Sequence, residues 1–161
     1  MGKRKPQRIT VVEPPKGVPP SLVFLVPLAL SLGLDYLLPL RIPYKQVLSP
    51  IGFALLLVSL VLMYAASGAQ SRQKTTATAW RHNEALVTDG PFRWSRNPAY
   101  LAFVIWFFAA GMLMASWWPF IFLAPTMVAF HHLVIVKEEA YLAARFGDAY
   151  EAYRAKVRRW L

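Results

Sequence analysis

Residues 97–136 read NPAYLAFVIWFFAAGMLMASWWPFIFLAPTMVAFHHLVIV and contain no Asp, Glu, Lys or Arg. A helix needs about 20 apolar residues to cross the roughly 30 Å hydrocarbon core of a bilayer, so this stretch is long enough for two crossings. In its middle stand Trp117 and Trp118, suited to a membrane interface, and Pro119, suited to the first turn of a new helix. The stretch therefore predicts a helical hairpin inside a membrane.

Two stretches nearer the N-terminus have the same character. Residues 17–40 contain one charged residue, Asp35, and residues 46–71 contain none. Each is long enough for one crossing. The sequence predicts an all-α, polytopic membrane protein with four transmembrane helices and cytoplasmic amphipathic helices at the C-terminal end. The crossings are expected near residues 21–40, 47–68, 98–116 and 119–137.

The basic residues indicate the orientation of these helices. With the N-terminus inside, 16 of the 18 Lys and Arg fall in cytoplasmic parts, and only Arg41 and Lys45 lie outside. An odd number of crossings would put either the 72–96 loop or the C-terminal tail on the wrong side. We therefore expect a multi-pass membrane protein with both termini in the cytoplasm.

Composition excludes several other classes of protein. Of 161 residues, 57% are apolar and 16% charged, which is too apolar for a disordered chain. Residues 1–20 are predicted to be a disordered basic tail and residues 21–161 a single domain. The net charge of +10 does not indicate nucleic acid, because the basic residues form no stripe along one surface. With no Cys and only three His, no metal is expected.

The first of two predicted cytoplasmic segments with candidate functional residues ends LVTDGPFRWSRNPAY, residues 86–100. Asp-Gly-Pro is turn chemistry, and Asn97 before Pro98 predicts a helix start with the Asn side chain as its cap. The N-terminus of such a helix favours an anionic group. The alternative is that Asn97 only caps the helix, while Arg93 and Arg96 only contact lipid headgroups.

The second such segment reads KEEAYLAARFGDAYEAY, residues 137–153. Gly147 is expected to end one helix, and Asp148 with Glu151 resembles a capping box that opens the next. Glu138 and Glu139 are two adjacent carboxylates at the membrane boundary, which are tolerated where they meet a cation or a polar cavity. The candidate partners are Arg93, Arg96 and a bound cationic ligand.

Three further polar residues lie within the apolar stretches. His131 precedes Glu138 by seven residues and shares nearly the same helix face, so it is a candidate pocket wall; a hydrogen-bonded histidine of the bundle is the alternative. His132 points about 100° away from His131, so the two do not hold one metal together. Asp35 is expected to form an ion pair with Arg41 or Lys45.

The block LVTxGPFRWxRNPxY, the hairpin after it and the motif EExxLxxxFGxxYxxY resemble the isoprenylcysteine carboxyl methyltransferase family, with which phospholipid N-methyltransferases share the double Glu. The resemblance covers the chain from Glu84 to the C-terminus. It implies methyl transfer from S-adenosylmethionine, bound under the cytoplasmic end of the bundle. The cofactor contacts that it implies are Glu84, Ala85, Leu86, Val87, Phe92, Asn97, Pro98, Ala99, Tyr100 and Glu138.

Two departures from the family pattern bear on the methyl acceptor. Asn97 replaces a His, and Val134 replaces the Arg that meets the substrate carboxylate. The resemblance therefore implies a lipophilic acceptor from the bilayer, either isoprenylcysteine-like or another nucleophile, with Val134 and His131 beside it. Catalytic candidates are Arg96, together with Glu139 or His131 as a base for an amine acceptor. The alternatives are an NADPH-dependent membrane lipid reductase and a non-catalytic membrane scaffold.

Overall fold

The computed structural model describes residues 17–72 and 85–161, and these residues form helices connected by turns, with no extended strand. The predicted tail lies largely in residues 1–16 and Glu84 lies in residues 73–84, both outside the described residues. The helices are α1 (Pro20–Leu37), α2 (Lys45–Arg72), η1 (Gly90–Arg93, a 3₁₀ turn), α3 (Pro98–Met114), α4 (Trp118–Phe130), η2 (His131–Ile135, a π-helical turn), α5 (Val136–Phe146) and α6 (Asp148–Lys156).

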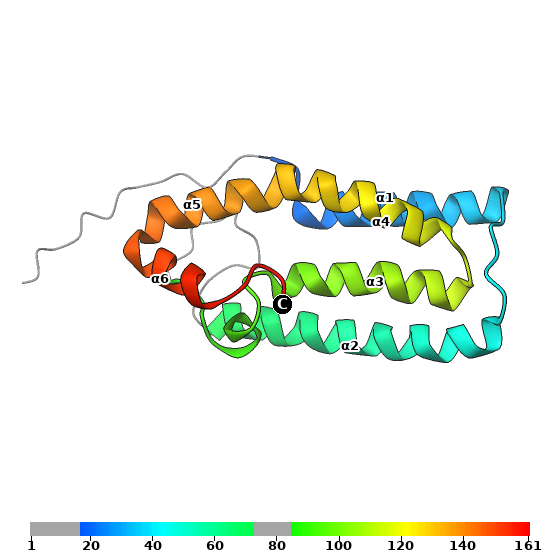
Figure 1. Ribbon diagram of the computed structural model, residues 1–161, viewed down its shortest axis with the longest axis horizontal. Helices are drawn as coiled ribbons and strands as arrows, with labels where there is room; N and C mark the ends of the chain where they lie inside the picture. The colour runs from blue at the N-terminus through cyan, green and yellow to red at the C-terminus, as the bar shows by residue number, and fades with distance from the viewer. Residues whose placement is uncertain (1–16, 73–84) are drawn as a thin grey trace, which may run out of the picture.

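Helices α1 to α4 run alternately in opposite directions along the long axis of the molecule (Figure 1). Helix α2 packs along α3, and α1 packs along α4. At one end, the segment between α1 and α2 meets the turn after α3, where the Ile42 N–H donates to the Ala115 carbonyl at 2.7 Å. The opposite end carries α5, α6, η1 and the C-terminus (Figure 1). The bundle therefore has two chemically different ends.

Within residues 17–72 and 85–161, three helices are long and apolar enough to cross a membrane: Pro20–Leu37, Lys45–Arg72 and Trp118–Phe146. Helix α3, Pro98–Met114, is apolar but shorter. The third of the long helices combines α4, η2 and α5, so the helix predicted to end at residue 137 continues to Phe146. No Gly or Pro interrupts residues 126–146, and the first residue that stops the helix is Gly147, with φ at 51°.

The start of α6 differs from the prediction. Gly147 ends α5 as expected, but Gly147 itself precedes α6, and Asp148 is already the first helical residue. No side chain caps this helix, so the predicted capping box of Asp148 and Glu151 is wrong. Because the helix begins one residue early, both carboxylates fall in its first turn, where they still favour the positive end of the helix dipole.

An aromatic core joins helices α1, α3 and α4. Phe24 of α1, Phe107 of α3 and Phe130 of α4 are fully buried, and the Phe24 and Phe130 rings lie 4.4 Å apart. Val134 belongs to the same cluster and is 1% exposed. At the far end of α1, the predicted ion pair is confirmed, because Arg41 donates to the buried Asp35 carboxylate at 2.9 Å.

Helices α2 and α3 approach each other most closely at Gly52. A Cβ atom there would lie 2.7 Å from the Leu113 nitrogen and 2.9 Å from the Ala109 carbonyl oxygen. We expect Gly52→Ala to lower the free energy of unfolding by about 1 to 3 kcal/mol, because backbone cannot move aside cheaply. Gly33→Ala in α1 is the control, since a Cβ there meets nothing within 4 Å. Thermal unfolding in detergent measures both, and equal midpoints for the two variants would contradict the close approach.

Candidate functional site

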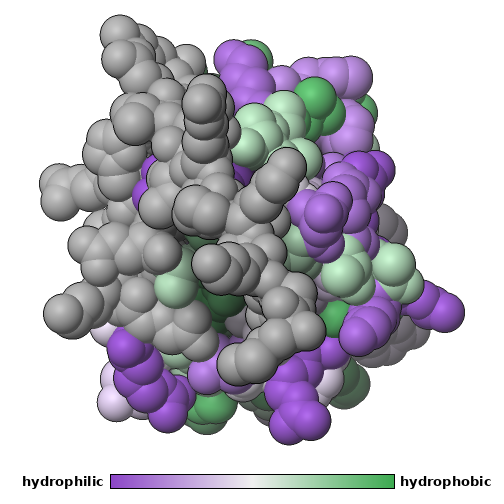
Figure 2. All heavy atoms as spheres, turned by 90° about the vertical axis from the view of Figure 1, so that its left-hand side faces the viewer, coloured by the Kyte–Doolittle hydropathy of each residue, from purple (hydrophilic) through white to green (hydrophobic). Residues whose placement is uncertain are grey.

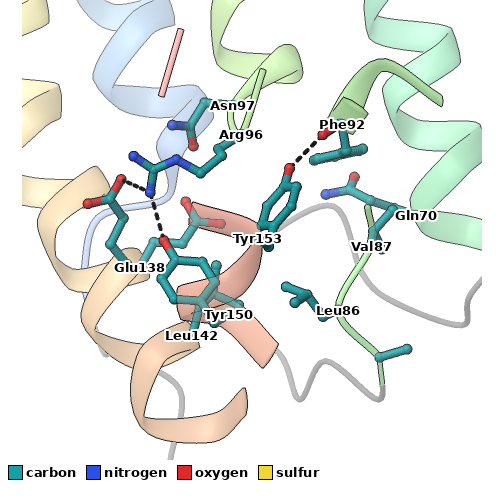
Figure 3. A pocket seen from close by; sticks show the side chains of 12 residues that line it. Gln70, Leu86, Val87, Phe92, Arg96, Asn97, Glu138, Leu142, Tyr150 and Tyr153 are labelled. Carbon is teal, nitrogen blue, oxygen red and sulfur yellow. Dashed lines mark hydrogen bonds and ion pairs between the residues drawn. The ribbon is translucent and has the colours of Figure 1, made fainter. Parts of the chain in front are cut away.

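A pocket lies at the end of the bundle that carries α5, α6 and η1 (Figure 3). We call it the rim pocket. It draws residues from α2, from the segment before α3, from α5 and from α6. Its enclosed space is about 50 Å³, room for only a few water molecules. A larger ligand therefore requires the lining side chains to move. They are Gln70, Ala85, Leu86, Val87, Phe92, Arg96, Asn97, Glu138, Glu139, Leu142, Tyr150 and Tyr153.

The segment before α3 forms one wall of the rim pocket. Gly90, with φ at 56°, begins the 3₁₀ turn that the Asp-Gly-Pro sequence predicts. The turn buries Phe92 against Ala66, Ala69 and Val87. Tyr153 of α6 donates its hydroxyl to the Phe92 carbonyl at 2.7 Å, so α6 is tied to this wall (Figure 3).

Asn97 precedes α3 as predicted, but its side chain does not cap the helix. The Asn97 Nδ2 atom donates to the Arg159 carbonyl at 3.2 Å, and the Asn97 N–H donates to Ser95 Oγ at 3.1 Å. The predicted cap is therefore wrong. Its side chain turns instead to the C-terminal segment, which offers a carbonyl acceptor that no local sequence pattern reveals.

The C-terminal segment lies beside the residues that precede α3. The Arg96 N–H donates to the Arg158 carbonyl at 2.9 Å, and Ser95 Oγ donates to the Arg159 carbonyl at 3.2 Å. Beyond these bonds, Trp160 packs against the aromatic core. The last residues of the chain therefore hold the wall of the rim pocket in place.

Glu139 lies between two guanidinium groups. Arg159 donates to its two carboxylate oxygens at 2.9 and 2.7 Å, and Arg96 Nη1 lies 3.0 Å from Oε1. Arg96 also donates to the Tyr150 hydroxyl at 3.2 Å (Figure 3). Of the cations predicted as partners for the paired carboxylates, Arg96 is confirmed. Arg93 is exposed.

Glu138 differs from its neighbour in having no cation beside it among the described residues. The Tyr100 hydroxyl donates to its Oε2 atom at 2.9 Å, and none of the ion pairs within residues 17–72 and 85–161 involves it. The Glu138 carboxylate lines the rim pocket. It is therefore the carboxylate of the pair that can meet a cationic ligand.

The tyrosines of α6 contribute hydroxyl groups that stay protonated. Burial raises the pKa of Tyr153 and that of Tyr150 above the usual tyrosine value. Both side chains therefore remain hydrogen-bond donors throughout the neutral range. The hydrogen bonds that Arg159 donates to the Glu139 carboxylate raise the pKa of Arg159, so this ion pair also persists.

Two polar atoms in the wall of the rim pocket are buried without a hydrogen-bond partner among the described residues. They are Oε1 of Gln70, an acceptor, and Nε of Arg96, a donor. Buried polar atoms nearly always have partners, so an unpaired acceptor and an unpaired donor in one pocket call for an explanation. A ligand with a donor and an acceptor would supply both partners.

The structure brings most of the predicted site residues together. Those that line the rim pocket are Ala85, Leu86, Val87, Phe92, Arg96, Asn97, Glu138 and Glu139. Pro98 and Ala99 follow in the first turn of α3, and Tyr100 reaches the pocket through Glu138. His131 and Val134 do not line it: His131 stacks edge-on against His132, and Val134 lies in the aromatic core.

Four lining residues were not predicted as site residues. Leu142 shares the helix face of Glu138, and Tyr150 and Tyr153 share the apolar face of α6. Their spacing could therefore have predicted that these three residues line the same site. Gln70 carried a weaker signal, as an uncharged polar residue near the end of a long apolar helix.

Comparison with known proteins identifies the family. A family model described as phospholipid methyltransferase matches residues 48–149. Over 88 residues, 55% of the chain, the sequence is 36% identical to the protein-S-isoprenylcysteine O-methyltransferase of Schizosaccharomyces pombe, and the match covers 37% of that protein. Over 27 residues, 17% of the chain, it is 59% identical to an uncharacterized protein of Haemophilus influenzae, 43% of which is covered.

The chain thus covers less than half the length of the curated relatives that it matches. No solved structure matches it. The family model spans well over half of the chain and includes every lining residue of the rim pocket except Tyr150 and Tyr153. The family model and the relatives confirm the resemblance that the sequence motifs indicate. The chain belongs to the phospholipid methyltransferase family.

Proposed function

We propose that the chain is an S-adenosylmethionine-dependent methyltransferase that acts on a lipophilic acceptor at the cytoplasmic face of a membrane. One observation carries the proposal. The rim pocket joins residues 85–87, Phe92, Asn97 and Glu138, positions to which the family resemblance assigns cofactor contacts. The family membership and the methyltransferase among the relatives support the same reaction class.

The residues present suit this cofactor. S-adenosylmethionine combines a cationic sulfonium and ammonium, a carboxylate and a flat base, and when bound it supplies an activated methyl group. Glu138, which has no cation beside it in the described part of the chain, would hold the positive charge. The unpaired Nε of Arg96 would donate to the carboxylate. The apolar wall of Leu86, Val87 and Phe92 would cover the base.

The chain's part in the reaction is to bind, orient and exclude water. Methyl transfer needs the acceptor in line with the transferred group, so positioning supplies much of the acceleration. An amine acceptor must also lose a proton, and we propose Glu139 for this step, with His131 as the second candidate. Glu139 lines the rim pocket, whereas His131 lies in the π-helical turn above it. Arg96 holds Glu139 in place.

We further propose four crossings with both termini in the cytoplasm. Helix α3 has 17 residues and is about 25 Å long, slightly shorter than the hydrocarbon core. Its contacts with α2 and α4 keep it inside the bundle. Hydrophilic side chains gather at the rim-pocket end (Figure 2), whereas Arg41 and Lys45 are at the other end. By the positive-inside rule, this distribution of charge supports a cytoplasmic rim pocket.

A route for a lipophilic acceptor lies next to the rim pocket. An apolar groove of about 530 Å³ runs between α2 and α3, and Pro91, Trp94 and Pro98 line it. These residues alternate with Phe92, Arg96 and Asn97, which line the rim pocket. Residues 91–98 therefore line both the rim pocket and the groove. We propose that the hydrocarbon chain of the acceptor occupies the groove.

A ligand screen on the detergent-purified chain tests the proposal. We expect S-adenosylmethionine and S-adenosylhomocysteine to raise the midpoint of thermal unfolding, because a ligand at a hundred times its Kd stabilises the folded state by about 2.7 kcal/mol. NADPH should leave the midpoint unchanged. Stabilisation by NADPH alone would favour a membrane lipid reductase, and no response to any of the three would favour a non-catalytic scaffold.

A further inference from the structure

Gln70 is the one lining residue of the rim pocket that comes from α2. It lies near the C-terminal end of this helix, one residue after the buried Ala69. Its Oε1 atom is buried and has no hydrogen-bond partner among the described residues. A carboxamide oxygen that is buried without a hydrogen-bond donor destabilises the folded state, so its presence here needs a reason.

The lining of the rim pocket is divided into two halves. Arg96, Glu138 and Glu139 lie together, joined to each other or to tyrosines by the contacts described above. Gln70 lies in the other half, beside Phe92 and Val87 (Figure 3). The wall there consists of the apolar cluster of Ala66, Ala69, Val87 and Phe92. Charged groups of a ligand fit the first half, and a flat apolar ring with polar edges fits the second.

A glutamine carboxamide is complementary to the edge of an adenine ring. Its oxygen accepts from the exocyclic amine while its nitrogen donates to a ring nitrogen, a pairing that proteins also use to recognise adenine in DNA. Guanine and hypoxanthine present an oxygen where adenine presents the amine. In the orientation in which Gln70 Oε1 accepts from adenine, that oxygen would face Oε1, so two acceptors would meet.

We propose that Gln70 is a specificity-determining residue that recognises the adenine base of the bound nucleoside by accepting a hydrogen bond from its 6-amino group. The inference rests on the proposed function and adds to it the direction of the ligand. The base lies at the Gln70 end of the rim pocket and the charged amino-acid part at the Glu138 end.

Calorimetric titration of the full chain in detergent tests this with two ligands that differ at one group. S-adenosylhomocysteine carries the 6-amino group, and S-inosylhomocysteine carries an oxygen in its place. We expect the unaltered chain to prefer the adenosyl ligand by about tenfold or more. In Gln70→Met and Gln70→Ala, we expect the preference to fall to about twofold or less, mainly through weaker binding of the adenosyl ligand.

Ser71→Ala is the matched control, since Ser71 is exposed and does not line the pocket. It should retain the preference. The stability of the ligand-free protein gives a second readout. Gln70→Met removes an unpaired buried acceptor, so its unfolding midpoint should equal or exceed that of the unaltered chain. A residue with a purely structural role would show a lower midpoint.

The outcomes separate this inference from the proposed function. If the unaltered chain binds both nucleosides equally, or if the Gln70 variants weaken both by the same factor, Gln70 does not recognise the base, while the proposed cofactor class stands. If the unaltered chain binds neither nucleoside, both proposals are wrong. A preference that disappears in both Gln70 variants and persists in Ser71→Ala supports the inference.

Discussion

Glu138→Gln is expected to weaken the binding of S-adenosylmethionine by about ten- to a hundredfold, the usual effect of removing a charged hydrogen-bonding partner. The amide keeps the shape of the side chain and can still accept from the Tyr100 hydroxyl. What is lost is the negative charge that Glu138 contributes to the rim pocket, where no cation of residues 17–72 and 85–161 pairs with it. Calorimetric titration measures the change in Kd, and a methyl-transfer assay should show a parallel loss of rate.

A second ligand identifies which charge the carboxylate meets. S-adenosylhomocysteine has a neutral sulfur but keeps the ammonium group, so its binding should weaken less if Glu138 faces the sulfonium. Glu151→Gln is the control, because Glu151 is exposed on α6 and its ion pair in the described residues is with the exposed Arg154 at 3.6 Å. Unchanged binding of S-adenosylmethionine by folded Glu138→Gln and Glu138→Ala variants would remove Glu138 from the site.

The membrane-spanning helices were predictable because the signal is long and one-dimensional. Excluding charge from about 20 consecutive residues is a requirement of the bilayer and does not depend on tertiary contacts. The same reason explains why helix ends were less predictable. Asn97 has the residue type of a helix cap, but its side chain donates to the Arg159 carbonyl, 62 residues away in sequence. A local pattern cannot reveal a competing partner at that distance.

The lining of the rim pocket was predictable where its residues come from two short motifs. Both segments reach the rim pocket, and they bring Phe92, Asn97 and Glu138 to one place. Gln70 lies outside both motifs, in a helix that carries no signature. Its place in the lining of the rim pocket depends on how α2 packs along α3, which is a property of the folded bundle.

A local irregularity of the helix explains why the predicted position of His131 beside Glu138 differs from the structure. Seven residues before Glu138, His131 should share nearly the same face of a regular α-helix. Between them lies the π-helical turn of residues 131–135. Such a turn contains about one extra residue, which rotates the helix before it by about 100° relative to the helix after it. His131 therefore does not line the rim pocket beside Glu138.

Glu139→Gln is expected to lower the free energy of unfolding by about 3 kcal/mol, the scale measured when one partner of a buried ion pair is removed. The side chains of Glu139 and Arg96 are 14% and 11% exposed, so hydration replaces little of the lost ion-pair interaction. Without the carboxylate, two guanidinium groups face each other across the position it occupied. Thermal or denaturant unfolding in detergent measures the loss.

Two further variants show whether charge causes this loss. Arg159→Ala should cost less than Glu139→Gln, because Arg96 still neutralises the carboxylate. Arg154→Ala is the matched control, since its ion pair is exposed and should contribute at most about 0.5 kcal/mol.

The double variant Glu139→Gln, Arg159→Gln distinguishes repulsion between the guanidinium groups from the loss of separate contacts. If repulsion between the two guanidinium groups dominates, removing one of them should return part of the stability that Glu139→Gln removes, so the two substitutions will not be additive. Additive losses would mean instead that Glu139 and Arg159 each stabilise the wall of the rim pocket through separate contacts. The carboxylate would then not be what couples the C-terminal segment to Arg96.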